Sequence, residues 1–484
     1  MTLELTDPAL MRPQCYVGGL FIGEGTDPVR NPATGDELAR VPAFSAQDAT
    51  DAVEAAAAAF KPWARLLAKE RSQILRRWFG LMMAHRDDLA AILTAEQGKP
   101  LAEAKGEIDY AASYVEFYAE ETKRIAGETL PSHRADGRII VLRQPSGVVA
   151  AITPWNFPAA MITRKIAPAL AAGCTVVVKP APETPLTAFA LAELGHRAGM
   201  PAGVFNVITG PAAPIGEVFT SHPAVRVVGF TGSTPVGKLL MRQAAGTVKK
   251  VLLELGGNAP FIVFDDADLD AAVEGAIAAK FRNMGQTCVC ANRIYVQRGV
   301  EAEFTDKLAQ AIRKLKVGNG FEDGVNQGPL ITQRAVGKVE DHLADALGKG
   351  ATIKVGGHRH ALGGTFFEPT LVTGLTPEMR IAREETFGPV APVFAFDTED
   401  EVIARANDTE FGLAGYMYSR DIGRIFRVAE ALEYGMVGIN SGLISTELAP
   451  FGGIKESGNS REGSHHGIEE FTEKKYLFVG GLDR

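Results

Sequence analysis

Short β-branched runs alternate with helical stretches between Val148 and Leu255, and this alternation limits the possible folds more than any other feature of the sequence. The expected elements are strands at 148–153, 175–179, 203–208, 226–230 and 250–255, and helices at 159–172, 184–199, 214–221 and 234–245. This order indicates βαβ units that form a parallel sheet covered by helices on both faces. Because such sheets bind ligands beyond the carboxyl ends of their strands, the functional residues are expected there.

A second alternating α/β region follows from Phe261 to about Phe451. With 484 residues the chain is too long for one hydrophobic core, so we expect two substantial domains. Amphipathic helices are expected at 45–60, 69–84, 89–96 and 101–126, with a hairpin turn at 31–36. A β excursion is expected around 124–145, and 477–480 is expected to be a terminal edge strand that can pair with a neighbouring subunit.

Composition excludes several classes of function. The net charge of −8 argues against nucleic acid or an anionic membrane surface as a partner. The first residues are acidic and interrupted by Pro8, unlike a secretory signal, and the uncharged stretch 198–216 contains too much Gly and Pro to span a membrane. Four cysteines do not make a disulfide framework, so we expect a protein of the reducing cytoplasm.

Two strand ends carry residues suited to bind a nucleotide. The segment from Phe230 to Gly237 follows a strand and opens a helix, where free N–H groups favour an anion such as a pyrophosphate. Gly232 and Gly237 are equally consistent with plain turn and packing glycines. Lys179 ends its strand before Pro180 and is either a donor to ribose hydroxyls or an ordinary surface lysine.

The first strand of the set ends in Pro154-Trp155-Asn156-Phe157-Pro158, where two prolines make a rigid turn. This turn would hold the Asn156 amide in one orientation, and an amide N–H₂ is a suitable donor to an oxyanion. Glu254 lies in the apolar run Leu252-Leu253-Glu254-Leu255. A carboxylate there is either a partly desolvated general base or a salt-bridged structural residue.

The segment Gly285-Gln286-Thr287-Cys288-Val289-Cys290 contains two of the four cysteines. We predict that Cys288 is a catalytic nucleophile, activated as the thiolate by backbone N–H groups of the preceding loop. The alternative is a small buried hydrophobic residue, the commoner environment of a free cysteine.

Together these motifs closely resemble the aldehyde dehydrogenase superfamily along nearly the whole chain. The resemblance rests on six segments in the same order: Pro-Trp-Asn-Phe-Pro around Asn156, Val-Val-Lys-Pro around Lys179, Phe230-Thr231-Gly232-Ser233, Leu-Glu-Leu-Gly-Gly around Glu254, Gly285-Gln286-Thr287-Cys288, and Glu385-Thr386-Phe387-Gly388-Pro389. It implies an α/β fold of two doubly wound parallel-sheet domains with a small β excursion for oligomerisation. The implied parts are a dinucleotide-binding domain at 1–121 and 144–253, a catalytic domain at 254–452, and an oligomerisation element at 122–143 and 453–484.

The resemblance also implies a mechanism and a homo-oligomer, either a dimer or a dimer of dimers. Cys288 attacks the aldehyde carbon, Asn156 and the Cys288 backbone N–H stabilise the oxyanion, hydride passes to a nicotinamide, and Glu254 activates the water that hydrolyses the thioester. The residues implied to contact the cofactor are Thr153, Pro154, Trp155, Lys179, Pro182, Glu183, Gly232, Ser233, Leu255, Glu385 and Phe387. No metal is implied.

Within the superfamily, the cysteine loop and the segments Gly442-Leu443-Ile444-Ser445 and Pro450-Phe451-Gly452-Gly453 resemble the succinate-semialdehyde dehydrogenase group. The resemblance implies that Arg164, Arg282 and Ser445 hold a carboxylate at the far end of the aldehyde, a task that suits guanidinium geometry. Both arginines are also consistent with helix-surface salt bridges. Glutarate semialdehyde is the rival substrate, because one extra methylene is discriminated only about 10–200-fold.

The cofactor prediction depends on Pro182. Relatives that prefer NAD commonly have a glutamate three residues after the lysine, whereas here that position is Pro182 and the glutamate is Glu183. A carboxylate beside the ribose would repel a 2′-phosphate, so its absence predicts that NADP is accepted and preferred, with NAD also possible.

Three alternatives stay open at this stage. Cys290 is either a redox partner that inactivates Cys288 by forming a disulfide, or a packing cysteine that stays reduced. A non-enzymatic relative would be expected to lose Cys288 or Glu254. A relative that transfers the acyl group to CoA would have to exclude water, and Glu254 argues against that activity.

Overall fold

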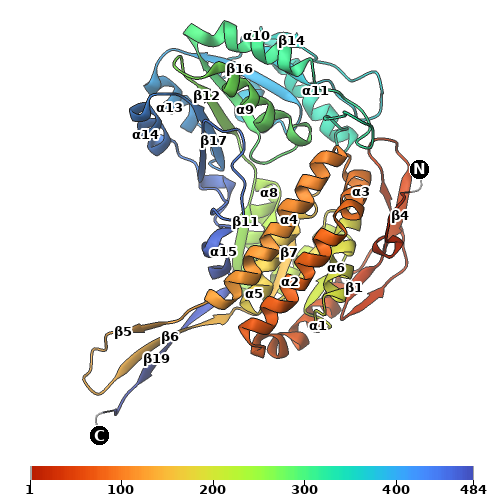
Figure 1. Cartoon of the computed structure of the whole chain (residues 1–484), viewed down its shortest axis with the longest axis vertical. Helices are drawn as coiled ribbons and strands as arrows, with labels where there is room; N and C mark the ends of the chain where they lie inside the picture. The colour runs from red at the N-terminus through yellow and green to blue at the C-terminus, as the bar shows by residue number, and fades with distance from the viewer. Residues whose placement is uncertain (1–2, 483–484) are drawn as a thin grey trace.

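The computed structural model describes residues 3–482, so positions 1–2 and 483–484 of the predicted end segments lie outside it. The chain forms two lobes, each built on a seven-stranded sheet, and a narrow β arm that extends from the lower lobe (Figure 1). Within 3–482, no helix combines the length and the apolar character needed to cross a membrane.

The first sheet has the order β11-β10-β7-β8-β9-β1-β2, and its first five strands are parallel. They are β7 (Val148–Ile152), β8 (Thr175–Lys179), β9 (Phe205–Val207), β10 (Val225–Thr231) and β11 (Lys250–Glu254). Each begins and ends within two residues of its predicted limits. The hairpin of β1 (Cys15–Val17) and β2 (Leu20–Ile22) adds two antiparallel strands at the far edge.

Alternate residues of β7 enter two different cores. Val149 and Ala151 pack against α2 (Ala68–Ala84), α3 (Arg86–Gln97), α4 (Leu101–Glu121), α5 (Ala160–Ala172) and α6 (Leu186–Arg197), which form one helical layer. Val148 and Ala150 pack on the other face with α1 (Ala46–Arg65) and α7 (Ala212–Ser221), and α8 (Thr234–Ala244) covers the β10 and β11 edge. The predicted sheet with helices on both faces is therefore confirmed.

The second sheet has the order β14-β15-β16-β13-β12-β17-β18 and is parallel except at β14. Its strands are β12 (Ala259–Val263), β13 (Ala291–Gln297), β14 (Thr352–Val355), β15 (Thr370–Thr373), β16 (Val390–Phe396), β17 (Ala414–Tyr418) and β18 (Met436–Ile439). Its helices are α9 (Leu269–Phe281), α10 (Glu301–Ile312), α11 (Gln333–Gly348), α12 (Arg380–Arg383), α13 (Glu399–Asn407) and α14 (Ile422–Ala431). The confirmed fold class is thus α/β with two doubly wound sheets.

The arm is an antiparallel sheet of β5 (Glu128–Leu130), β6 (Arg138–Pro145) and the C-terminal β19 (Thr472–Val479), with β6 in the centre. The structure corrects two limits here. The terminal strand begins at Thr472 rather than 477, because it pairs with β6 over the full length of that strand. The helix expected over 101–126 ends at Glu121, and the Thr122 hydroxyl then donates to the Tyr118 carbonyl.

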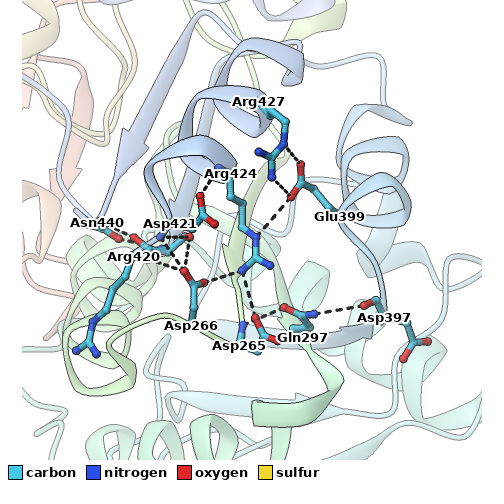
Figure 2. A network of polar contacts seen from close by, with 11 residues as sticks. Asp265, Asp266, Gln297, Asp397, Glu399, Arg420, Asp421, Arg424, Arg427 and Asn440 are labelled. Carbon is cyan, nitrogen blue, oxygen red and sulfur yellow. Dashed lines mark hydrogen bonds and ion pairs between the residues drawn. The ribbon is translucent and has the colours of Figure 1, made fainter.

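A network of charged side chains connects the carboxyl ends of the second sheet (Figure 2). Strand order reverses between β12 and β17, and there the Asp266 carboxylate accepts hydrogen bonds from the Ser419 hydroxyl and from the backbone N–H groups of Arg420 and Asp421. Arg424 donates to the other Asp266 oxygen at 2.7 Å and also contacts Asp265. The point where the strand order of the second sheet reverses, which in open α/β sheets is the usual place for a ligand, is therefore filled by side chains of the protein itself.

Two smaller elements complete the chain. The predicted turn at 31–36 joins β3 (Asp27–Arg30) and β4 (Glu37–Val41) as an antiparallel hairpin. Short α15 (Ser464–Glu469) packs against α5 and leads into β19, so the C-terminal segment crosses the first lobe before it enters the arm. How the chain divides into domains stays a prediction.

Candidate active site

A cleft of about 830 Å³ lies where the carboxyl ends of β7, β10 and β11 face α11 and the segment before β16. Its walls contain Pro154, Trp155, Asn156, Glu183, Thr231, Gly232, Ser233, Leu255, Gly256, Cys288, Ile331, Thr332, Arg334, Ala335, Gly337, Lys338, Asp341, Arg380, Glu385, Thr386 and Phe387. Most predicted site residues are therefore brought together. The others, Thr153, Lys179, Pro182, Glu254, Arg164, Arg282, Ser445 and Cys290, lie outside these walls.

The start of α8 forms the part of the cleft suited to an anion. Ser233 precedes the helix in an extended conformation, and its side chain makes no capping hydrogen bond. A side chain at Gly232 would lie 2.4 Å from the Phe230 ring, and one at Gly237 would lie 2.6 Å from Leu255. Both glycines thus pack closely against neighbouring side chains. Gly232 and Ser233, directly before α8, line the cleft at the end of the helix where anions are favoured.

The loop before Cys288 has an unusual backbone. Asn283, Met284 and Gly285 have φ values of +51°, +58° and +71°, three left-handed residues in succession. A side chain at Gly285 would lie 2.2 Å from the Gly388 carbonyl oxygen, so the loop packs directly against the segment that carries Glu385 and Phe387. Strain of this kind persists only where surrounding contacts hold the backbone.

Cys288 lines the cleft opposite Asn156, whose amide donates to the Gln286 carbonyl at 3.1 Å. Burial raises the pKa of the Cys288 thiol to about 12, and the Glu385 and Glu254 carboxylates act in the same direction. The positive charges of Arg164 and Arg282 lower this pKa but do not compensate. Cys288 is half-buried in the cleft wall. Its activation by backbone N–H groups of the preceding loop stays a prediction.

Cys290 is buried, and its side chain does not line the cleft. Its thiol donates to the Lys280 backbone carbonyl at 3.3 Å, and both Cys288 and Cys290 are free thiols. Its role as a redox partner stays a prediction.

Glu254 ends β11 and is buried, with 2% of its surface exposed. One carboxylate oxygen accepts from the Ser460 hydroxyl at 2.9 Å, and the other has no hydrogen-bond partner within 3–482. Burial, helped by the neighbouring Glu462 carboxylate, raises the pKa of Glu254 to about 8. At neutral pH this carboxyl group is therefore mostly protonated, and it can exchange a proton near physiological pH.

Glu385 and Phe387 come from the second lobe and form the opposite wall of the cleft. Glu385 accepts from the Gly257 backbone N–H at 3.2 Å, and burial raises its pKa to about 7. Phe387 has a φ of +56° and packs edge-to-face on Trp155 with ring centres 5.6 Å apart. A contact between lobes thus shapes the floor of the cleft.

Lys179 is buried at the end of β8, next to the cleft wall formed by Glu183. Its ammonium group donates to the Pro180 carbonyl at 3.3 Å; burial lowers its pKa, against the opposing charge of Glu183. Pro182 is exposed. The Thr153 backbone N–H donates to the Lys179 carbonyl at 3.1 Å, which continues the pairing of β7 with β8 by one residue.

The three residues predicted to bind a distal carboxylate are not in mutual contact. Arg164 is 2% exposed, forms an ion pair with Glu462 at 2.6 Å, and stacks over the Phe451 ring at 3.8 Å. Arg282 lies over the Phe157 ring at 5.3 Å. Ser445 lies in the loop after β18. The backbone carbonyl of the next residue, Thr446, accepts a hydrogen bond from the Tyr114 hydroxyl.

Three further residues surround the site that the sequence motifs do not mark: Glu462, Lys165 and Ser460. Glu462 is buried between Arg164 and Lys165, and Ser460 holds Glu254. No local pattern marks them, since Glu462 is 297 positions from Lys165 and Ser460 is 206 positions from Glu254. Only the path of the C-terminal segment past α5 brings them to the site.

The comparisons with known proteins agree with this geometry. A family model described as the aldehyde dehydrogenase family matches residues 23–477. The chain is 62% identical to 3-sulfolactaldehyde dehydrogenase of Pseudomonas putida, with all of both chains covered. It is 61% identical to the NADP(+) succinate-semialdehyde dehydrogenase GabD of Escherichia coli and 61% identical to glutarate-semialdehyde dehydrogenase of Pseudomonas aeruginosa, each covering 99% of this chain and 100% of the relative.

A solved structure of a similar protein also has the same fold. A crystal structure of succinate-semialdehyde dehydrogenase from Burkholderia pseudomallei superposes with a TM-score of 0.98 at 62% identity, and covers 99% of this chain and 100% of that one.

Proposed function

The chain belongs to the aldehyde dehydrogenase family, and from this premise we propose that it oxidises succinate semialdehyde to succinate with NADP as the preferred oxidant. The observation that supports the proposal most directly is the cleft, which places the Cys288 thiol, the Asn156 amide and a dinucleotide-sized cavity together. Arg164, which is buried, and Arg282, which is half-buried, would supply the preference for an anionic aldehyde.

The cleft suits a nicotinamide dinucleotide. Its volume is adequate, and the start of α8 would offer N–H groups for the pyrophosphate. Glu385 in the cleft wall and Lys179, buried behind Glu183, would bind ribose hydroxyls. When bound, the cofactor supplies the two-electron acceptor that takes hydride from the aldehyde carbon. Pro154, Trp155, Leu255 and Phe387 in the cleft walls, and Thr153 just behind them, would pack around its ring systems.

Cys288 forms the bond to the substrate. Its sulfur adds to the aldehyde carbon, and the negative charge that develops on the aldehyde oxygen is stabilised by the Asn156 amide and the Cys288 backbone N–H. Because the resting thiol has a raised pKa, its proton must pass to a nearby base as the bond forms. Loss of hydride from the carbon then leaves a thioester on Cys288.

Glu254 completes the reaction. Its ionised carboxylate takes a proton from water, the water oxygen attacks the thioester carbon, and the carbon–sulfur bond breaks to release the carboxylate product. The free carboxylate oxygen of Glu254 is consistent with this role, since it has no acceptor or donor already bound within 3–482.

Arg164 supports an anionic group at the far end of the aldehyde. Although it forms an ion pair with Glu462, its Nε has no hydrogen-bond partner among the described residues, and its charge acts on Cys288. A buried guanidinium with unused donors is suited to a carboxylate. With Arg282 and Ser445 it would hold succinate semialdehyde; glutarate semialdehyde and sulfolactaldehyde, the substrates in two relatives' names, are the alternatives.

Substrate preference is tested by following reduced-nicotinamide formation. We expect kcat/KM for succinate semialdehyde to exceed that for butyraldehyde, an uncharged aldehyde of equal chain length, by at least about 100-fold, because a charged pair in a desolvated pocket contributes about 3 kcal/mol. Arg164→Met should remove most of this difference. Equal use of butyraldehyde would contradict the substrate assignment while leaving the Cys288 chemistry untouched. Higher values for glutarate semialdehyde or sulfolactaldehyde would favour those substrates.

The cofactor preference is tested at Pro182. We expect Pro182→Glu to move the ratio of kcat/KM for NADP over NAD toward NAD by about 10-fold or more, because a carboxylate there would repel the 2′-phosphate. Pro182→Gln, which adds the same length without charge, is the control. If both variants shift the ratio equally, charge at this position does not set the preference.

We also propose that the chain forms a homo-oligomer of two or four copies. The arm ends in exposed apolar side chains of β19, including Tyr476, Leu477 and Val479, and the outer edge of β18 is free for strand pairing among the described residues. The mass of the protein in solution distinguishes one, two and four copies.

A further inference from the structure

A group of polar residues at the junction of α3 and α4 has no part in the mechanism above. Gln97, Lys99 and Glu107 are buried, Glu103 is half-buried, and none of them lines the cleft. Burying polar side chains is costly unless each has a partner, so their contacts indicate what they hold.

Lys99 contacts the turn that carries Asn156. Its ammonium group is 2.6 Å from a Glu107 oxygen, donates to the Asn156 backbone carbonyl at 2.8 Å, and lies 3.8 Å from the centre of the Phe157 ring. The side chain is completely enclosed. Three contacts of one cation thus restrict the position of the peptide from which the Asn156 amide projects.

Glu107 extends this hold to the next helix. Its other oxygen accepts from the backbone N–H groups of Ala159 at 2.9 Å and Ala160 at 3.3 Å, at the start of α5. Arg164 lies one turn further along that helix. One ion pair therefore fixes the Asn156 turn and the helix that carries the proposed substrate arginine.

Gln97 and Glu103 hold the strained loop before Cys288. Gln97 accepts from the Lys99 backbone N–H and donates to the Asn283 side chain at 3.0 Å, while Glu103 accepts from the Asn283 backbone N–H at 2.9 Å. The Asn283 amide in turn donates to the Asn156 carbonyl at 3.0 Å, the same oxygen that Lys99 contacts. The Asn156 turn and the Cys288 loop, which come from different lobes, thus meet at a single carbonyl group.

We propose that Lys99 is a positioning residue that sets the distance and orientation of the Asn156 amide relative to Cys288. The inference rests on the proposed role of Asn156 as oxyanion donor. A hydrogen-bond donor stabilises a transition state only when it is already placed where the charge develops, and a displacement of about 1 Å can cost 10²-fold in rate. Lys99 acts on the reaction through Asn156 and touches neither substrate nor cofactor.

The test is a double-mutant cycle in the full-length protein. Lys99→Met combined with Glu107→Gln removes the contact to Asn156 without leaving an unpaired buried charge, and the new amide side chain retains an oxygen for the Ala159 and Ala160 N–H groups. We expect kcat to fall about 100-fold while KM changes less than about threefold. In an Asn156→Ala background the same two substitutions should lower kcat less than about threefold, because the amide that they misplace is absent.

Asp88→Asn is the matched control. Asp88 is another buried carboxylate that accepts from two backbone N–H groups, those of Thr6 and Asp7, but it contacts no part of the cleft, so kcat should be unchanged. An unchanged kcat in the folded Lys99→Met/Glu107→Gln variant, or an equal loss in both backgrounds, would overturn the inference. If Asn156→Ala alone keeps full kcat, the proposed role of Asn156 itself fails.

Discussion

Replacing Cys288 with alanine is expected to lower kcat for aldehyde oxidation by about 10⁵-fold or more. The sulfur forms the covalent bond to the substrate, and without it neither the Asn156 amide nor Glu254 has an intermediate to act on. The loss should be in kcat, with cofactor affinity retained, because the start of α8 and the Glu385 wall remain intact. Reduced-nicotinamide formation and a separate equilibrium measurement of cofactor binding distinguish these two effects.

Cys290→Ala is the matched control for this experiment. Its thiol donates to the Lys280 carbonyl rather than facing the cleft, so the variant should keep kcat within about threefold. A Cys288→Ala variant with more than about 1% of the original kcat would show that the reaction does not pass through a bond to this sulfur.

Replacing Glu254 with glutamine is expected to lower steady-state turnover by about 10²- to 10⁴-fold and to separate the two halves of the reaction. The first turnover should still release close to one reduced nicotinamide per chain, because the thioester forms but hydrolyses slowly. In the unsubstituted protein the base is active only when ionised. Burial raises the pKa of Glu254 to about 8. Steady-state turnover should therefore be low at acidic and neutral pH, reach half of its maximum near pH 8, and level off at higher pH.

Ser460→Ala tests the same assignment from the other direction. The Ser460 hydroxyl donates to Glu254 and lowers its pKa, so its removal should move the midpoint of the pH profile upward. A steady-state profile of Glu254→Gln with the original midpoint would mean that another group titrates.

Local sequence patterns are sufficient for the framework of the first sheet. The β-branched runs at Val148 and Thr175 and the turn residues after them fix where strands end, and parallel strands bring their carboxyl ends to one edge. Asn156 and Gly232, which follow β7 and β10, can therefore be assigned to one edge from the sequence. Cys288 precedes β13 of the second sheet, so only the family resemblance assigns it to the same site. The helix limit at Glu121 escapes such reasoning, because amphipathic spacing continues beyond the residue at which the backbone turns.

Long-range electrostatics cannot be read from the sequence. The pKa of Cys288 depends on Arg164, Glu254, Arg282 and Glu385, which meet only after both lobes have packed. Likewise, Glu462 reaches Lys165 across 297 positions of the chain. Such contacts are set by the path of the C-terminal segment, which no pattern in 453–484 specifies.

The polar network at the reversal point of the second sheet has a consequence for stoichiometry. Both sheets direct the start of a helix toward the edge where open α/β sheets take up phosphate groups, α8 in the first and α14 in the second. Just before α14 the Asp266 carboxylate already occupies the backbone N–H groups of Arg420 and Asp421, so a phosphate group would have to displace a tethered side chain to bind there. We therefore expect each copy of the chain to take up one dinucleotide, in the cleft at α8, whatever the size of the assembly.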